Sequence, residues 1–236
     1  MSTHIGAGYG SEFHLMRWMG RYRNELNTMI EQETGGQVIE WKDFKHSGKY
    51  DPADATKIKL PDKEITGIDF LSQERCADVF TAWKSFWPQT GNAPNWDAVG
   101  RIRSDSVDRW LLVEAKAHIG ELKSRCSAES PRSLETIEKA LHQTQQAVGI
   151  EVPRDWLKEY YQYANRLAVL HFLEYQGVPA CLLYIYFCGD TNPHADCPKE
   201  RDGWKEALEM QDSVLGLDSA KKKKFRIHTI YVGVTP

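Results

Sequence analysis

Apolar residues recur at helical spacing near the start of the chain, from Ser11 to Glu33, and Gly35-Gly36 ends this pattern. The segment 46–66 is rich in Lys, Asp, Pro and Gly, a composition typical of an exposed loop. The N-terminal part of the chain therefore predicts a helix over Ser11–Glu33, a short strand over Gln37–Phe44, a loop over 46–66 and a helix over about Ser72–Trp87, ending at Pro88.

The rest of the chain alternates strand-like and helix-like patterns. The predicted elements are strands over Asn95–Ile102 and Trp110–His118 joined by a polar turn over Arg103–Arg109, helices over Ser133–Val148 and Asp155–Gln176, a strand over Ala180–Phe187, a helix over Asp202–Leu215 and a strand over Phe225–Val234. This interleaving favours an α/β fold with a mixed sheet. We expect a single domain over 1–236, with its core at about 70–190, an N-terminal helix–strand extension over 1–66 and a C-terminal one over 200–236.

The charge balance limits the kind of nucleic-acid contact that this chain can make. Its 236 residues include 30 Lys+Arg and 33 Asp+Glu, a formal net charge of −3. That balance argues against a broadly basic DNA coat, because counterion-release binding needs a surplus of cations. Local surpluses remain: Lys42–Lys63 holds six Lys against four Asp, and Lys221–Arg226 holds five basic residues.

The cysteines and the apolar segments indicate the compartment. Five cysteines are scattered without a CxxC pair, which favours reduced thiols over a disulfide framework. The N-terminus shows no basic region followed by an apolar run, and the longest apolar stretches are shorter than the roughly 20 residues of a membrane helix. We therefore expect a cytoplasmic protein that does not bind a membrane.

The two central strands contain the most informative residues. Alternate residues of a strand share a face, so Glu114 and Lys116 project together, about 7 Å apart. If the strands form a hairpin, Asp97 approaches Glu114. Buried charges are costly unless they are paired or bind a metal, and two carboxylates with a backbone carbonyl suit magnesium or manganese.

The context distinguishes Glu114-Ala115-Lys116 from two other Glu-x-Lys patterns, at Glu40 and at Glu121. No aspartate precedes Glu40, and Glu121 follows Gly120, beyond the end of the apolar run. Only Glu114 lies in an apolar strand directly after a strand that bears an aspartate. The alternative for Glu114 and Lys116 is a structural salt bridge on an edge strand.

The arrangement Asp97…Glu114-Ala115-Lys116 on a hairpin, followed by two helices and an apolar strand, resembles the PD-(D/E)xK nuclease superfamily over roughly residues 70–190. The resemblance implies a restriction-endonuclease-like core, a mixed central sheet flanked by helices on both faces. It also implies a magnesium ion held by Asp97, Glu114 and the Ala115 carbonyl. Lys116 would orient or deprotonate the attacking water and stabilise the developing charge. Trp96 stands where the family's name suggests proline.

The helix predicted over Asp155–Gln176 is apolar nearly all round, except for a polar stripe of Gln162, Asn165 and Arg166 at i, i+3 and i+4. In the related RecB-like nucleases a glutamine occupies this place beside the metal, so the resemblance implies a catalytic role for Gln162. The alternative is a stripe that meets solvent or a neighbouring subunit.

Several further residues remain open as site candidates. A third acidic ligand often comes from the first core helix of the superfamily, and Glu25, Glu31 and Glu74 are equivalent in this respect. His118 continues the face of Glu114 and Lys116, so it could touch a substrate or simply be exposed.

Three residues are of the types that bind zinc, namely Cys188, His194 and Cys197. They lack a fourth partner at the usual spacing, which favours a plain loop. Lys221–Lys224 could contact phosphates, although a solvated loop is the more common role of such a run. Most of the eight tryptophans have the spacing of core residues rather than of stacking platforms for bases.

Together these observations predict a magnesium-dependent (or manganese-dependent) nuclease that acts on DNA, with RNA second. The alternative is a catalytically inactive nuclease-fold protein that binds nucleic acid or another protein. A hydrolase of a small phosphorylated substrate is a third reading, for which the sequence shows no pocket motif. The strandedness of the substrate, endo- or exonuclease action, and a homodimer or protein partner stay open.

Overall fold

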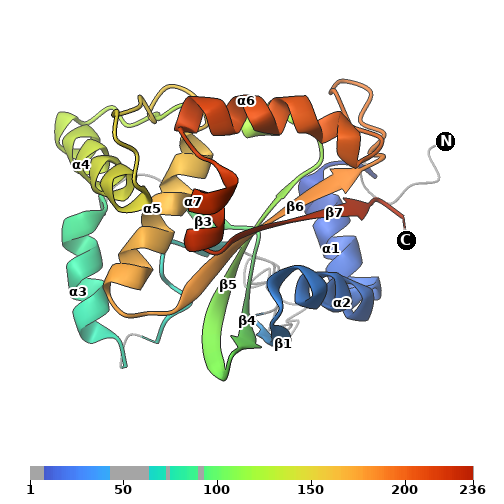
Figure 1. The fold of residues 1–236 in the computed structure, drawn as a ribbon, viewed down its shortest axis with the longest axis horizontal. Helices are drawn as coiled ribbons and strands as arrows, with labels where there is room; N and C mark the ends of the chain where they lie inside the picture. The colour runs from blue at the N-terminus through green and yellow to red at the C-terminus, as the bar shows by residue number, and fades with distance from the viewer. Residues whose placement is uncertain (1–7, 43–63, 73–74, 90–92, 236) are drawn as a thin grey trace, which may run out of the picture.

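The computed structural model describes residues 8–42, 64–72, 75–89 and 93–235. Its centre is a five-stranded sheet in the order β1-β4-β5-β6-β7 (Figure 1). The strands are β1 (Gln37–Trp41), β4 (Ala98–Ser104), β5 (Val107–Lys116), β6 (Ala180–Cys188) and β7 (Ile227–Gly233). The pairs β1–β4 and β4–β5 are antiparallel, whereas β5–β6 and β6–β7 are parallel. The mixed α/β sheet expected from the alternating pattern is therefore confirmed.

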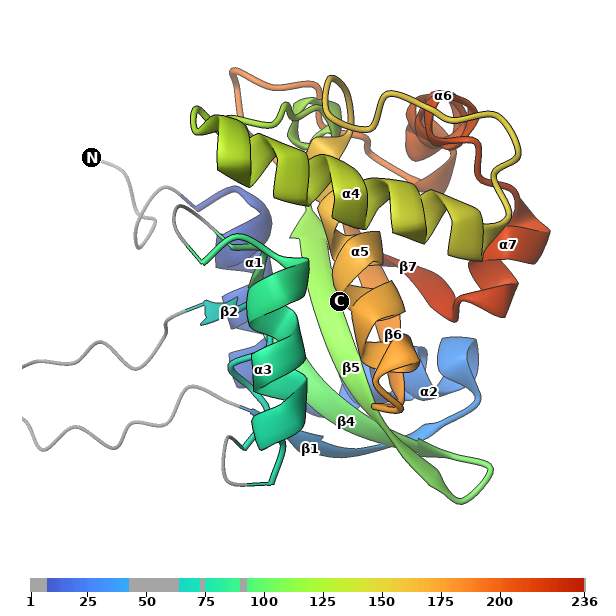
Figure 2. The ribbon, with the colours of Figure 1, turned by 90° about the vertical axis from the view of Figure 1, so that its left-hand side faces the viewer.

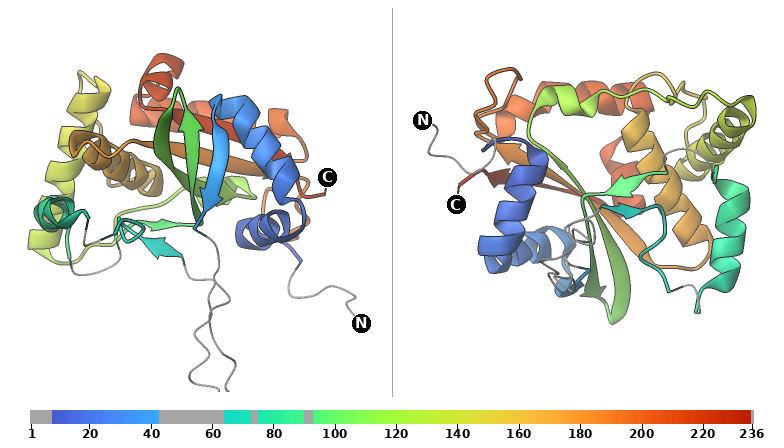
Figure 3. Two further views of the ribbon diagram at one scale, coloured as in Figure 1. Left: turned by 90° about the horizontal axis from the view of Figure 1, so that it is seen from below. Right: turned by 180° about the vertical axis from the view of Figure 1, so that it is seen from behind.

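Helices cover both faces of this sheet. The helices are α1 (Ser11–Arg21), α2 (Arg23–Thr34), α3 (Ala77–Phe86), α4 (Pro131–Val148), α5 (Tyr161–Tyr175), α6 (Lys205–Leu215) and α7 (Ser219–Lys224). The sheet separates α1 and α2 from α3, α4 and α5, as the views in Figure 2 and Figure 3 show. Two hydrophobic clusters result, one under α1 and α2 and a larger one around α5. The segments at the two ends of the chain supply the edge strands β1 and β7.

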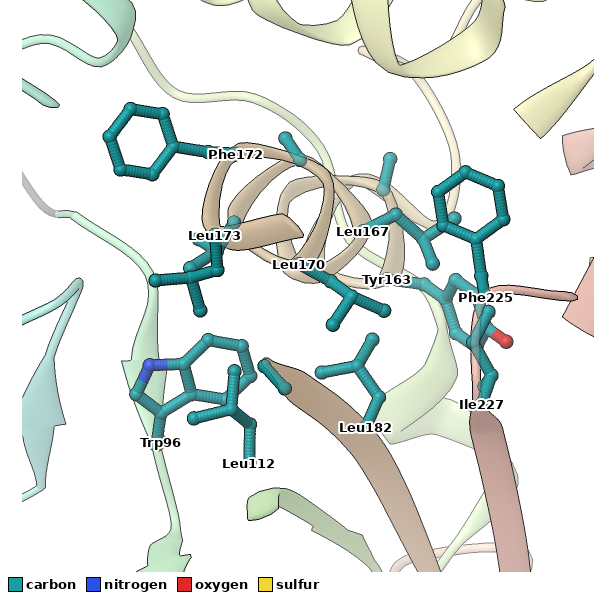
Figure 4. Close-up of a cluster of buried hydrophobic side chains, with 14 of the residues drawn as sticks. Trp96, Leu112, Tyr163, Leu167, Leu170, Phe172, Leu173, Leu182, Phe225 and Ile227 are labelled. Carbon is teal, nitrogen blue, oxygen red and sulfur yellow. The ribbon is translucent and has the colours of Figure 1, made fainter. Parts of the chain in front are cut away.

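The core beside α5 fixes the position of β5. Leu167 and Leu170 of α5 pack over Leu182 of β6, and Trp96 lies beside Leu112 of β5 (Figure 4). Trp96 is fully buried, and its indole N–H donates to the carbonyl of Gly67 at 2.8 Å. The face of β5 that packs against α5 is therefore covered by apolar side chains, until charged residues replace them along the strand.

The hairpin β4–β5 differs from the expected one in its turn and in its start. The predicted turn over Arg103–Arg109 is too long, because Ser104 pairs with Val107 and only Asp105 and Ser106 connect the strands. Both have positive φ, 50° and 61°, as a tight two-residue hairpin turn requires. At the other end the predicted strand divides into β3 (Asn95–Trp96), paired with β2 (Ile65–Thr66), and β4, with Asp97 between them.

Three predicted helices also have different bounds. The helix expected from about Ser72 begins only at Ala77, after Cys76, whose φ of −129° lies outside the helical region. The helix expected over Ser11–Glu33 breaks at Tyr22, whose φ of −127° lies outside the helical region. The helix expected from Asp155 begins only at Tyr161, because Tyr160 adopts a left-handed conformation with φ 56°. The Lys221–Lys224 run, for which a solvated loop was favoured, lies in the short helix α7.

Two predicted features, the strand end at Phe44 and most of the loop over 46–66, lie outside the described residues, and the end of that loop forms β2. Within the described ranges, no helix is long and apolar enough to cross a bilayer.

Candidate functional site

Asp97 lies beside β5 at the point where β4 begins. Its backbone N–H donates to the Val113 carbonyl at 3.1 Å, and its Oδ2 accepts the N–H of Ala115 at 2.7 Å. At this break between β3 and β4 the Asp97 side chain, and not a backbone carbonyl, accepts the N–H of Ala115. The expected approach of Asp97 to the segment of Glu114 is therefore present in the structure.

Glu114 and Lys116 lie on the face of β5 that α5 covers, and both are buried, with exposed fractions of 3% and 8%. Lys116 Nζ donates to Glu114 Oε1 at 2.6 Å. Their place in a central strand between β4 and β6 excludes the alternative of an edge-strand salt bridge.

The polar stripe of α5 faces this pair. Lys116 Nζ donates to Gln162 Oε1 at 2.9 Å, and the Nε and Nη2 of Arg166 each lie 2.9 Å from Glu114 Oε2. The same guanidinium donates to Asn165 Oδ1 at 2.8 Å and lies over the Trp96 ring, 5.2 Å from its centroid. Asn165 and Arg166 are buried and Gln162 is half-buried, and Gln162 and Arg166 contact the strand residues. We call Asp97, Glu114, Lys116, Gln162 and Arg166 the carboxylate–lysine cluster.

The electrostatics of the cluster are dominated by its two carboxylates. Burial, and then the neighbouring charge of Glu114, raise the pKa of Asp97 from 3.8 to about 7. The Ala115 N–H, Lys116 and Arg166 act in the opposite direction and do not offset this increase. A further cation close to Asp97 would therefore favour the ionised form of this carboxyl group and lower its pKa.

The donor set of the cluster fits a hard divalent cation. Asp97, in the break before β4, and Glu114 of β5 carry the carboxylate oxygens. The Ala115 carbonyl points to the same edge of β5 as its N–H, which donates to Asp97, because both groups of an extended residue point the same way. Oxygen ligands of this kind suit magnesium or manganese. Within the described ranges no three His, Cys, Asp or Glu side chains form a metal-binding group, so water would complete the coordination shell.

Arg166 was singled out by the sequence only as part of a polar stripe, and its ion pair with Glu114 comes from the structure alone. The two residues are 52 positions apart. Together with Lys116, Arg166 occupies both oxygens of Glu114, so a metal ion would compete with these two cations for the carboxylate.

The structure brings neither Glu25 nor Glu31 to the cluster. Glu25 is exposed and Glu31 accepts the N–H of Val38, both on α2, which packs on the opposite face of the sheet. Glu74 lies outside the described residues. His118 lies 3.6 Å from Glu121 Oε1, and Glu121 also accepts the N–H of Ala117.

The remaining sequence candidates lie away from the cluster. Cys197 Sγ lies 3.9 Å from Asp190 Oδ2. Cys188 Sγ lies 3.9 Å from the carbonyl oxygen of Tyr186 on the same strand. The backbone N–H of His194 donates to Asn192 Oδ1 in the same loop. In α7, Lys221 and Lys222 form ion pairs with Asp218 and Asp212, which leaves Lys223 and Lys224 of the run without an acidic partner in the described ranges.

A very small cavity of about 10 Å³ adjoins the buried side of the cluster. Glu114, Lys116 and Gln162 line it together with Tyr184 of β6 and Gln211 of α6. The Tyr184 hydroxyl and Gln211 Oε1 are buried without a hydrogen-bond partner in the part of the chain that the structure describes. Gln211 is a site neighbour that the sequence did not indicate, since a lone glutamine on an amphipathic helix gives no signal.

Asp97→Asn is expected to stabilise the fold in the absence of metal, and increasingly so as the pH rises. Because the folded-state pKa of Asp97 is raised, ionisation opposes folding, and this cost grows between about pH 4 and pH 7. A cost of about 1–2 kcal/mol at pH 8 corresponds to about 2–8 °C in Tm for a chain of this size. The measurement is Tm of both proteins in chelator at pH 5 and pH 8. If the difference in Tm between Asp97→Asn and the wild type is the same at pH 5 and at pH 8, the electrostatic explanation is wrong.

Comparison with protein-family models, curated proteins and solved structures gives no significant match to this chain.

Proposed function

We propose that this protein is a metal-dependent nuclease of the PD-(D/E)xK type, which hydrolyses DNA with magnesium or manganese. The observation that supports the proposal most directly is the convergence of Asp97, Glu114, Lys116 and Gln162 from one hairpin and one helix. The element order agrees with the resemblance: the hairpin β4–β5 precedes α4, α5 and the buried strand β6. A restriction-endonuclease-like core is part of this proposal.

Each residue of the cluster has a separate task in this reaction. Asp97, Glu114 and the Ala115 carbonyl would hold the ion, which supplies an acidified water and charge stabilisation when bound. Lys116 directs its ammonium group to where negative charge develops on the phosphoryl oxygens. Gln162 accepts one hydrogen bond from Lys116 and Glu114 accepts another, so the position of Nζ is fixed from two sides.

Arg166 has a positioning role in the same scheme. Its two nitrogens at 2.9 Å hold Glu114 Oε2, and its stacking on Trp96 holds the guanidinium in turn. The carboxylate is therefore oriented before the ion arrives.

Arg166 also supports the second candidate function, a catalytically inactive fold that binds nucleic acid or protein. Lys116 and Arg166 both pair with Glu114, so the charge of this carboxylate is balanced without any metal ion. A protein that had lost its metal could keep such a buried, compensated cluster as a structural element. The two functions differ in whether a divalent ion enters the cluster.

The test of the proposed function is a cleavage assay with the purified chain. Single-stranded DNA, duplex DNA and RNA are incubated with magnesium, with manganese and with chelator. We expect DNA cleavage with either metal, no cleavage in chelator, and loss of cleavage in Asp97→Asn, which retains the side-chain shape.

Metal binding is measured independently of cleavage, through Tm. A ligand that binds only the native state raises its stability, so magnesium should raise Tm of the wild type and have little effect on Asp97→Asn. If the wild type is inert towards every substrate and its Tm does not respond to either metal, the nuclease proposal fails and the binding function is favoured.

A further inference from the structure

A cavity of about 540 Å³ lies directly beside the carboxylate–lysine cluster. Gln162, Asn165 and Arg166, the polar stripe of α5, form the wall that the cavity shares with the cluster. The other walls come from the end of α3, from β3 and from the start of α4. Figure 2 shows α4 running across the upper ends of α3 and α5. The volume lies in the range of about 300–1,000 Å³ that is typical of small-molecule sites.

The lining of this cavity is partly polar and partly apolar, and it offers little positive charge. Uncharged hydrogen-bonding side chains line it: Asn95, Ser127, Ser130, Ser133, Tyr161, Gln162 and Asn165. Its charged lining residues are Glu64, Glu129 and Arg166, and the guanidinium of Arg166 is already engaged by Glu114. Such a lining suits the uncharged hydrogen-bonding edge of a base better than it suits a phosphate chain.

Positive charge lies instead next to the lining residues Cys126–Ser130 and Ser133 along the chain. The segment 123–132 contains Lys123, Arg125 and Arg132 against the single acid Glu129. All three cations are exposed, and none forms an ion pair within the described ranges. We call these three cations, which flank lining residues of the cavity in the sequence, the rim. Exposed cations next to a cavity with few charges suit a nucleic-acid strand, with phosphates outside and a base inside.

We propose that this cavity receives the base of one unpaired nucleotide, and that the DNA substrate is therefore single-stranded or locally unpaired. The inference rests on the proposed function and specifies its substrate. The phosphates on either side of the inserted base lie along Lys123, Arg125 and Arg132, and the shared wall of Gln162 and Arg166 brings the strand to the cluster. A base inside a duplex cannot enter unless it leaves the stack.

The cavity is tested by filling it. Ser133→Trp places an indole at the lining of the cavity, and Gln143→Trp is its matched control, an uncharged and exposed position on the same helix. We expect Ser133→Trp to lower kcat/KM on a single-stranded oligonucleotide by about tenfold or more, the size of one lost base contact. Gln143→Trp should behave as the wild type, and both variants should keep the magnesium-dependent increase in Tm.

The rim and the strandedness are tested with the same oligonucleotides. Arg125→Ala should weaken single-strand binding and reduce the slope of log K against log salt by about 0.7, the value for one phosphate contact. A fully paired duplex should be cleaved at least about tenfold more slowly than the same duplex with an unpaired gap or flap, which exposes a base to the cavity.

The outcomes separate this inference from the proposed function. Metal-dependent cleavage with equal rates on paired and unpaired DNA, or with equal effects of Ser133→Trp and Gln143→Trp, overturns the cavity assignment and leaves the nuclease intact. If no substrate is cleaved, fluorescence anisotropy with a labelled single strand still decides. Binding by the wild type that is lost in Ser133→Trp supports the cavity, and the absence of binding overturns it.

Discussion

Replacement of Glu114 by alanine is expected to lower the free energy of unfolding by about 3–5 kcal/mol. Glu114 is the only carboxylate that Lys116 and Arg166 contact in the described ranges, and the side chains of the two cations are 10% and 5% exposed. Without it, two positive charges remain buried and unpaired, and removal of one partner from a buried ion pair is far more damaging than loss of a surface pair. The expected decrease in Tm is about 6–20 °C.

The matched control for this prediction is Asp155→Ala, which removes the carboxylate of an exposed pair. Asp155 and Lys158 lie 2.7 Å apart, with side chains that are 49% and 79% exposed. An exposed pair contributes about 0–1 kcal/mol, so the control should unfold nearly as the wild type does. Chemical denaturation in chelator measures both variants. A loss below about 1 kcal/mol in Glu114→Ala would mean that the cluster is hydrated and its ion pairs are not structural.

Lys116→Met is expected to reduce the rate of DNA cleavage at saturating magnesium by about 10²–10⁴-fold. Methionine fills most of the volume of the lysine stem but removes the charge that would meet the developing negative charge. Because Lys116 is not a metal ligand in the proposed function, the magnesium-dependent increase in Tm should remain. This combination, lost turnover with retained metal binding, distinguishes Lys116 from Asp97.

The control for Lys116→Met is Lys42→Met, in the Glu-x-Lys pattern that begins at Glu40. Lys42 contacts Glu40 at the edge of the sheet, where both side chains are partly exposed. Lys42→Met should cleave DNA at the wild-type rate. Equal rates for Lys116→Met and the wild type would remove Lys116 from the reaction and leave it as a structural partner of Glu114.

Local sequence patterns predicted the type and order of the elements around the site, but not all of their ends. The alternation of side chains along Trp110–Lys116 places Glu114 and Lys116 on one face, whatever the strand pairs with. The preceding strand with Asp97 distinguished the Glu-x-Lys pattern at Glu114 from those at Glu40 and Glu121. The two-residue turn at Asp105–Ser106 was not predicted, since residues that adopt positive φ without being glycine carry a weak signal.

Long-range packing decided what surrounds those residues. Arg166 contacts Glu114 because α5 lies on the face of β5 that bears Glu114, a placement that no pattern within α5 specifies. Glu25 and Glu31 lie away from the cluster because α2, which carries them, packs on the opposite face of the sheet. Gln211 reaches the small cavity only through the packing of α6.

The sequence by itself therefore determined an α/β chain with an acidic pair and a lysine on a buried hairpin, because strand periodicity is a local property of the backbone. Tertiary structure alone decided which charges meet that pair, and it placed the 540 Å³ cavity beside it. The physical reason is that burial of the apolar surfaces of α1, α2 and α5 selects the face of the sheet that each helix covers. Only that selection fixes the partners of Asp97, Glu114 and Lys116.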